Sequence, residues 1–242
     1  MIPTFGLEIV ARKLGNLAAN IRRLGPREAW RLYRYRLSER YDDWRLGIRT
    51  TGLVTPRELG HDAHCQPYEA IHYRCLDVIM DYFDPSPELD VLLDYGSGMG
   101  RAVIVAAMRP FKRVIGVELS STLNQIALDN ISRARSKLVC PDVQIVTIDA
   151  TQYHVPTEVT SVFLFNPFNG PVLEAVQQQI RDSLRQKPRP LRLVYMHPAH
   201  QVNTFDQCDW LQRDRQLPTA DWDDVKMVGY QAVVERMRAS TP

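Results

Sequence analysis

Short, almost wholly apolar runs alternate with helical patterns from about residue 67 onward, and this alternation constrains the fold more than any other feature. Runs such as VLLD and SVFLF lack the polar alternation of a strand that faces water on one side. Strands that are apolar on both faces and alternate with helices are typical of a parallel sheet covered by helices on both sides. The sequence therefore predicts an α/β, doubly wound fold.

The patterns also predict where the individual elements lie. A serine at position 120 or 121 is a suitable N-cap for one of the helices. Two further candidate strands near the C-terminus have no long helix between them, so we expect them to pair antiparallel as a hairpin at the sheet edge. The expected sheet is mainly parallel and seven-stranded. The expected strands are 90–94, 111–118, 143–149, 161–166, 191–197, 208–214 and 225–237, and the expected helices are 67–83, 101–108, 120–138 and 171–186.

Residues 1–60 differ in character from the rest and are expected to form a basic N-terminal helical extension, separate from a domain over 61–242. Residues 1–50 hold eleven Lys or Arg against five Asp or Glu. Apolar spacing predicts a helix over 7–24, and arginines are interleaved with aromatic residues over 27–44. The favoured interpretation is a solvated helix pair, because the acids dilute the positive field. A clamp for nucleic acid and a contact with an anionic membrane surface stay open.

Composition restricts the cellular setting. None of the four cysteines forms a C-x-x-C pair, so free thiols in a reducing compartment are expected. The N-terminus lacks the apolar core of a signal peptide, and no run approaches the length of a membrane span. These features predict a soluble, cytoplasmic protein.

The stretch VLLDYGSGMG places Gly96, Gly98 and Gly100 directly after a predicted strand. Side chains at this first strand–helix turn would block a ligand that lies against the backbone. In a dinucleotide-binding G-x-G-x-x-G motif the third glycine would fall at position 101, which is Arg101. The spacing therefore disfavours a pyrophosphate ligand without excluding it.

Acidic residues stand at three successive strand ends, namely Asp94, Glu118 and Asp149. In parallel sheets such ends meet at one edge, where ligands bind. A carboxylate accepts two hydroxyl protons at once and suits a cationic ligand. Each acid alone is about as well explained by ordinary strand-end or turn chemistry, above all Asp149. Together with the glycines, they favour a binding site.

This series resembles the class I S-adenosylmethionine-dependent methyltransferases over roughly residues 62–242. DYGSGMG is similar to the first motif of that family, GVELS to its second acidic motif and IDAT to its third. The resemblance implies a Rossmann-like fold and S-adenosylmethionine as cofactor. It implies that the glycines approach the methionine portion, that Asp94 helps to hold its amino group, that Glu118 accepts the ribose hydroxyls and that Asp149 meets the adenine. The expected cofactor-binding set is Tyr68, Asp94, Gly96, Ser97, Gly98, Gly100, Glu118, Leu119, Asp149, Ala150 and Asn166.

The stretch FLFNPFNG marks the expected acceptor site, with Asn166, Pro167 and Phe168 as the catalytic candidates. Because a proline follows, we expect Asn166 to be extended. NPF resembles the (D/N)PP(Y/F) motif of methyltransferases that act on amino groups, but it lacks one proline. The non-SET lysine methyltransferases are a second resemblance, in which Tyr68-Glu69 loosely matches an upstream Tyr/Glu pair that we expect on the 67–83 helix. A packed core aromatic explains Phe168 about equally well.

The expected function is transfer of a methyl group from S-adenosylmethionine to a nitrogen or oxygen acceptor. A small molecule or a protein side chain is favoured over nucleic acid as that acceptor. The alternatives are a cofactor- or nucleotide-binding protein without catalysis and an NAD(P)-dependent oxidoreductase. His61 and His64 with Cys65, and His197 with His200, make no recognised zinc pattern, so no metal site is expected. A role for His197 or His200 as an acceptor-site base stays open.

Overall fold

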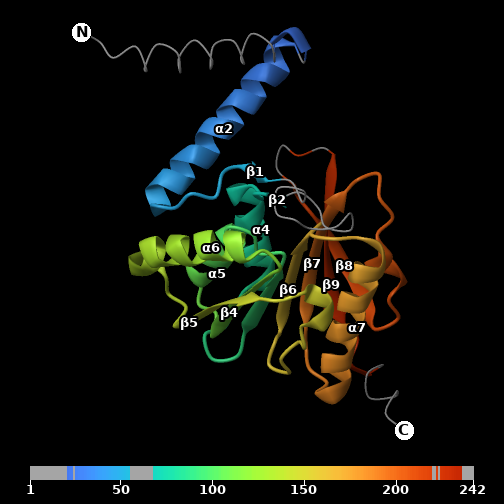
Figure 1. Ribbon diagram of the computed structural model, residues 1–242. Helices are drawn as coiled ribbons and strands as arrows, with labels where there is room; N and C mark the ends of the chain where they lie inside the picture. The colour runs from blue at the N-terminus through green and yellow to red at the C-terminus, as the bar shows by residue number, and fades with distance from the viewer. Residues whose placement is uncertain (1–20, 24, 55–67, 220–221, 223, 236–242) are drawn as a thin grey trace, which may run out of the picture. The chain divides into compact units, whose positions relative to one another are not determined.

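The computed structural model describes residues 21–23, 25–54, 68–219, 222 and 224–235. The chain divides into two compact units, Met1–Arg45 and Leu46–Pro242. Helix α2 (Pro26–Leu46) lies almost wholly in the first unit, where the sequence predicts a helix over 27–44 (Figure 1). The expected helix over 7–24 lies largely outside the described residues. Residues 46–54, which the sequence analysis grouped with the extension, belong to the second unit.

The second unit is built on a seven-stranded sheet with the strand order β5-β4-β3-β6-β7-β9-β8 (Figure 1). The first five strands in that order are parallel, and β9 pairs antiparallel with both β7 and β8. The predicted Rossmann-like doubly wound sheet with an antiparallel C-terminal hairpin is therefore confirmed. The strands are β3 (Val91–Tyr95), β4 (Arg113–Glu118), β5 (Asp142–Thr147), β6 (Ser161–Phe165), β7 (Arg192–Pro198), β8 (Leu211–Leu217) and β9 (Val225–Ala232).

Helices cover both faces of this sheet. Side chains of α4, α5 and α6 pack on one face, and those of α7 pack on the other. Ser120 caps α6 by accepting a hydrogen bond from the amide of Leu123 at 3.2 Å, which confirms one of the two expected caps. The helices are α4 (Tyr73–Phe83), α5 (Arg101–Ala107), α6 (Ser121–Ala134) and α7 (Gly170–Gln186), with short 3-10 turns η1 (Arg135–Lys137), η2 (Ala150–Gln152) and η3 (Thr204–Gln207).

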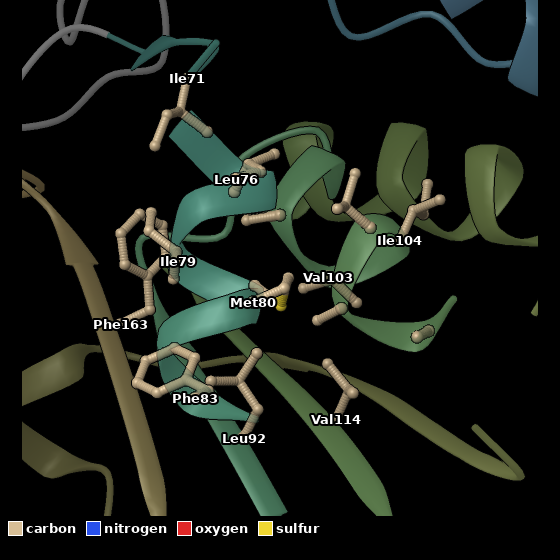
Figure 2. Packing of buried hydrophobic residues seen from close by; sticks show 14 of the residues in the cluster. Ile71, Leu76, Ile79, Met80, Phe83, Leu92, Val103, Ile104, Val114 and Phe163 are labelled. Atoms are coloured by element: carbon tan, nitrogen blue, oxygen red, sulfur yellow. The ribbon is translucent and has the colours of Figure 1, made fainter. Parts of the chain in front are cut away.

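The larger core forms where α4 crosses the sheet beside α5. Figure 2 shows Leu76, Ile79 and Phe83, which recur at helical spacing along α4 and point toward α5 and strands β3, β4 and β6. Leu76 and Ile79 are fully buried. Truncating either side chain to alanine is expected to cost about 2 to 5 kcal/mol, because the rigid sheet beneath does not close the cavity. This packing holds the ends of the central strands in fixed relation.

The predicted helix over 67–83 is wrong at its start. Tyr68–Glu69 instead forms the short strand β2, which pairs antiparallel with β1 (Leu53–Val54), and α4 begins at Tyr73. His72 keeps an extended backbone, and its buried ring stacks on Trp222 with centroids 3.8 Å apart. Aromatic packing at this point thus overrides the local helical pattern, and Tyr68 is carried by a strand pair rather than by a helix.

Cys75, Cys140 and Cys208 are free thiols, as the sequence predicts, and Cys65 lies outside the described residues. Within the described residues, no helix is both long and apolar enough to cross a lipid bilayer.

Candidate active site at the carboxyl edge of the sheet

The expected site residues converge on one edge of the sheet because the five parallel strands run in the same direction. Tyr95 at the end of β3 lies opposite Val117 of β4 on one side and Leu164 of β6 on the other. Phe165 at the end of β6 lies opposite Met196 of β7. Residues that follow directly after these ends, such as Asn166, therefore leave the sheet at the same edge.

The glycine turn after β3 is packed against two other segments. Gly96 and Gly98 have φ values of 76° and 54°, a region that L-residues with side chains rarely adopt. A Cβ at Gly96 would overlap Pro167, and a Cβ at Gly98 would overlap the ring of Tyr68. Bare backbone at both positions thus lets the end of β6 and the strand β2 reach the turn.

Gly100 ends the turn and begins α5, with a φ of 83°. A Cβ at this position would lie 3.0 Å from the Cβ of Ala127 on α6. Asn130 of α6 also donates to the carbonyl of Met99 at 3.0 Å and exchanges hydrogen bonds with the backbone of Arg49. Helix α6 therefore fixes both the end of the turn and the segment that leads to β1.

Glu118 connects the end of β4 to the glycine turn. Its Oε2 accepts from the amide of Gly98 at 3.0 Å, and its Oε1 accepts from the amide of Ser120 at 2.9 Å. Each carboxylate oxygen has two lone pairs, so both oxygens retain acceptor capacity. The next residue, Leu119, is 42% exposed and offers an apolar surface beside the carboxylate. The carboxylate of Glu118 and the apolar side chain of Leu119 together suit a ligand that has a sugar with vicinal hydroxyls attached to a flat ring.

Asp94 is buried at the end of β3, and its Oδ2 has no hydrogen-bond partner among the described residues. Burial, with a smaller contribution from the negative charge of Glu118, raises the pKa of Asp94 to about 8. A cation beside a buried carboxyl group stabilises its ionised form, because the cation replaces the lost solvation. The turn is therefore electrostatically suited to a positively charged ligand.

Asp149 and Ala150 follow β5 on the far side of β4. Oδ1 of Asp149 accepts from both the amide and the hydroxyl of Thr151, each at 2.8 Å, and so caps the turn η2. Ala150 is partly buried against the core that includes α7. Asp149 thus has the ordinary turn-capping role that its sequence also allowed. Its contact with the adenine of the cofactor stays a prediction.

The expected extended conformation of Asn166 is wrong. Its φ is 39°, in the left-handed region, although Pro167 follows. Asparagine tolerates this region better than other residues with side chains, and the contact of Pro167 with Gly96 holds the chain in the bend. Such a backbone costs on the order of 1 to 3 kcal/mol and is found preferentially at functional sites. Oδ1 of Asn166 is buried without a partner among the described residues.

Phe168 lies beneath this bend rather than on the surface. It is 6% exposed, and its ring meets the ring of Tyr95 edge-on with centroids 6.3 Å apart. Tyr95 in turn meets Tyr153 at 6.2 Å. In this position Phe168 supports the bend from below. Its catalytic role stays a prediction.

Buried polar atoms without a partner gather at this edge of the sheet. Most buried polar groups in proteins are hydrogen-bonded, so such a cluster requires an explanation. The described residues contain seven of these atoms, and all except Nε of Arg181 lie at strand ends or in the first turn of α6. These six atoms are Oδ2 of Asp94, the hydroxyl oxygen of Tyr95, Oγ of Ser97, Oδ1 of Asn124, Oδ1 of Asn166 and Nε2 of His197.

His197 occupies the end of β7, next to the strand that leads to Asn166. Its Nδ1 lies 2.9 Å from the carbonyl oxygen of Pro198, and because a carbonyl only accepts, Nδ1 carries the proton. Burial lowers the pKa of His197, although the hydrogen bond to Pro198 opposes this shift. The imidazole is therefore neutral near pH 7, and the lone pair of its buried Nε2 is unprotonated.

Tyr68 is fixed beside the glycine turn by several contacts. Its hydroxyl donates to the carbonyl of Thr50 at 2.7 Å. The guanidinium of Arg101, at the start of α5, binds the hydroxyl of Thr50 at 2.7 Å and the carbonyl of Ile71 at 2.8 Å. It also lies 4.4 Å from the ring centroid of Tyr73. Arg101 thus joins both ends of the β1–β2 region to the helix that follows the turn.

The structure adds three residues to those predicted from sequence. Tyr95 and Asn124 were not singled out, and Arg101 was considered only as the residue in place of a third glycine. Tyr95 follows Asp94 directly, so a hydroxyl at the end of an apolar strand was the available signal. Among the residues that the structure places, no three His, Cys, Asp or Glu side chains are arranged to hold a metal. His61, His64 and Cys65 lie outside the described residues.

Comparison with solved structures supports the fold assignment. The chain is similar to magnesium protoporphyrin IX methyltransferase from Synechocystis PCC 6803, which was solved with bound S-adenosylmethionine. That match has 16% identity and a TM-score of 0.51, and it covers 66% of this chain and 79% of the other. The Escherichia coli methyltransferase candidate yhhF gives 16% identity, a TM-score of 0.51, and coverage of 66% and 84%.

A precorrin 8w decarboxylase from Methanobacterium thermoautotrophicum gives 16% identity, a TM-score of 0.50, and coverage of 67% and 91%. No protein-family model matches the chain, and no curated protein is similar to it in sequence. The chain therefore has the fold of these proteins. Because one fold carries different chemistries, the activity has to be argued from the site.

Proposed function

We propose that the chain is an S-adenosylmethionine-dependent methyltransferase that transfers a methyl group to a nitrogen or oxygen acceptor. One observation carries the proposal. The glycine turn, which has two carboxylates beside it, is in direct contact with the strained end of β6 through Gly96 and Pro167. A site for a cationic donor and a site with an unpartnered amide oxygen are therefore adjacent.

The residues of the turn fit this cofactor in charge and in shape. S-adenosylmethionine carries an ammonium group and a methyl group bonded to a positively charged sulfur, and when bound it supplies that methyl group. Asp94 would hold the ammonium group, because its buried carboxyl group lacks a cationic partner among the described residues. Glu118 would accept the ribose hydroxyls with its remaining lone pairs. Leu119 and Ala150 would border the adenine, with Asp149 at its amino group.

The residues at the ends of β6 and β7 would handle the acceptor. Oδ1 of Asn166 would accept a hydrogen bond from the N–H or O–H group that is to be methylated, and so orient its lone pair. That lone pair forms the bond to the methyl carbon, and the electron pair of the broken carbon–sulfur bond stays on sulfur. Nε2 of His197, which is neutral and unpartnered, would take the proton that the acceptor loses.

The two rival functions make different demands on the same residues. A dinucleotide-dependent oxidoreductase would need close approach at position 101, where Arg101 is buried and bound to Thr50 and Ile71. A binding protein without catalysis would need only the turn and Glu118. The left-handed Asn166 and the unpartnered His197 favour catalysis, because neither is required to hold the cofactor.

We propose that the reaction takes place in the cytoplasm, and the free thiols at the described cysteines support a reducing compartment. We favour a small molecule or a protein side chain over nucleic acid as the acceptor. Asn166 and His197, which would handle the acceptor, are an amide and a neutral imidazole, whereas binding of a phosphate backbone depends on Lys and Arg.

Two measurements test the proposal. In the first, S-adenosylhomocysteine is titrated into the protein by calorimetry, and NADH is titrated separately. We expect micromolar binding of S-adenosylhomocysteine that Glu118→Gln weakens at least tenfold and that the exposed control Asp129→Asn leaves unchanged. Tight NADH binding without a response to S-adenosylhomocysteine would reverse the assignment.

The second measurement uses S-adenosylmethionine labelled in its methyl group and a cell lysate that is afterwards separated into protein, nucleic acid and small-molecule fractions. We expect label in the protein or the small-molecule fraction, and none above background with Asn166→Ala. Binding of the cofactor with no label in any fraction would refute catalysis and support the binding protein. Label in nucleic acid alone would refute the preferred acceptor class.

A further inference from the structure

Helix α2 carries a stripe of large apolar side chains that face solvent. Their exposed fractions range from 41% to 74%, although residues of this kind are normally buried. Two ring pairs lie along the stripe, Trp30 with Tyr33 at 5.8 Å and Tyr41 with Trp44 at 5.7 Å. The members of this aromatic stripe are Trp30, Tyr33, Leu37, Tyr41 and Trp44.

The helical repeat places all five members on one side of α2. With about 100° of turn per residue, they fall within an arc of about 80° centred on Leu37. From Trp30 to Trp44 the stripe is about 21 Å long, at about 1.5 Å per residue. A surface of this size on one element is an interaction site rather than scattered surface residues.

Most charged residues are sorted around the stripe by sign. Arg34 and Arg40 lie on opposite sides of it, each at about 60° from its centre, and three further arginines lie within about 100°. The sixth arginine, Arg31, lies at about 120° and pairs with Glu28 at 2.9 Å. All four acids of the helix lie more than about 110° from the centre, on the opposite side. Arg34 and Arg40 make no ion pair within the described part of the chain. The further arginines are Arg27, Arg36 and Arg45, and the acids are Glu28, Glu39, Asp42 and Asp43.

We propose that α2 docks on a membrane surface that contains anionic lipids. Helices that lie in the plane of such a surface combine large aromatic and aliphatic residues on one side with flanking basic residues. The aromatic stripe would enter the boundary between headgroups and acyl chains. Arg34 and Arg40 have long side chains that would reach the lipid phosphates beside the stripe. The acids, on the opposite side, are kept away from the negative surface.

Two features favour lipid over other partners. Leu37 at the centre of the stripe has no ring on which a base would stack, and Trp30 already stacks on Tyr33, so the stripe is a poor platform for single-stranded nucleic acid. In a pairing with a second copy, Trp30, Leu37 and Trp44 recur at heptad spacing. Two-stranded coiled coils use branched aliphatic residues at these positions, whereas two of these three are tryptophans. The stripe is therefore also poorly suited to pairing with a second copy of the helix.

The test uses the full chain and vesicles without cofactor, so its outcome is independent of the proposed methyl transfer. Vesicles of phosphatidylglycerol mixed with phosphatidylcholine are compared with vesicles of phosphatidylcholine alone, by flotation and by tryptophan emission. We expect binding to the anionic vesicles, with a blue shift from Trp30 and Trp44, and weak binding to the neutral vesicles. Trp210, which is buried, and Trp222, which is partly buried, belong to the second unit and supply a constant background.

Variants separate the apolar from the electrostatic contribution. Leu37→Ser with Trp44→Ser is expected to reduce vesicle binding at least tenfold, because both side chains enter the boundary. Arg34→Gln with Arg40→Gln is expected to reduce it about 30-fold, at about 1 kcal/mol for each arginine near an anionic surface. The matched controls Val202→Ser and Lys112→Gln change exposed residues of the second unit and should change nothing.

Three outcomes would overturn the proposal. The first is no binding to anionic vesicles at low salt. The second is binding that the stripe variants retain in full. The third is a different occupant, shown either by a dimer in sedimentation velocity that Leu37→Ser dissociates or by an RNA complex that anionic vesicles do not compete away.

Discussion

Asp94 makes ligand binding dependent on pH in a way that can be calculated. Its pKa of about 8 in the ligand-free protein means that the carboxyl group is mostly protonated at neutral pH. A ligand with an ammonium group at this position requires the ionised form, so it must displace the proton. The apparent dissociation constant therefore contains a factor of 1 plus the ratio of protonated to ionised Asp94, which grows about tenfold for each pH unit below 8.

The size of the effect follows from that factor. Between about pH 8 and about pH 6 the factor rises from about 2 to about 100, so affinity for S-adenosylhomocysteine should weaken about 50-fold, or about 2.3 kcal/mol. At about pH 7, binding should release about 0.9 protons per protein molecule, since this is the protonated fraction of Asp94. The sign is fixed: affinity rises as pH rises toward 8.

Calorimetry in pairs of buffers with different ionisation enthalpies measures both quantities. Asp94→Asn carries no titrating group at this position, so its affinity should be nearly independent of pH, and the two curves should approach each other near about pH 6. Any titration of the ligand itself appears in both proteins and cancels in the comparison. The control Asp81→Asn, an exposed carboxylate on α4, should keep the full slope. A wild-type affinity that is flat over this range, or a slope that survives in Asp94→Asn, would refute the reasoning.

Four further outcomes follow from the same contacts. Between about pH 4 and pH 8 and without ligand, the folded protein binds more protons at Asp94 than the unfolded chain does. Its free energy of unfolding should therefore fall as pH rises over that range. In urea titrations at several pH values, Asp94→Asn should flatten this fall. Gly98→Ala should cost about 1 kcal/mol more in the wild type than in a Tyr68→Ala background, and a double-mutant cycle without coupling would contradict the ring contact. Arg101→Met should lower the free energy of unfolding by about 2 to 3 kcal/mol through lost hydrogen bonds, and a loss below about 0.5 kcal/mol would show that it does not hold the β1–β2 region. His197→Gln should reduce methyl transfer at least 100-fold with an unchanged dissociation constant for S-adenosylhomocysteine, and near-normal transfer would remove His197 as the base.

Much of the fold follows from the sequence because the buried parallel strands are short apolar runs separated by helices. The adjacency of Asp94 and Glu118 was likewise predictable, since both stand at carboxyl ends of strands and β3 pairs with β4. Ser120 is a cap that the residue type alone indicates. These features depend on local patterns that tertiary packing reinforces rather than opposes.

The remaining features depend on contacts between distant segments. The helical pattern before Tyr73 gives way to strand β2 because His72 stacks on Trp222, about 150 residues later in the chain. Asn166 is left-handed because Pro167 packs on Gly96, and neither partner is indicated by its own neighbours in sequence. The charge sorting around the aromatic stripe was present in the sequence, but the exposure of its members required the structure.

The most direct test of the central claim is a crystal structure of the protein grown with S-adenosylhomocysteine at saturating concentration. The account predicts the nucleoside at the ends of β3 and β4, with its ribose hydroxyls on Glu118 and its amino group toward Asp94, over the turn that contains Gly98. Density for the nucleoside at another place on the molecule, or none above this turn, would contradict it.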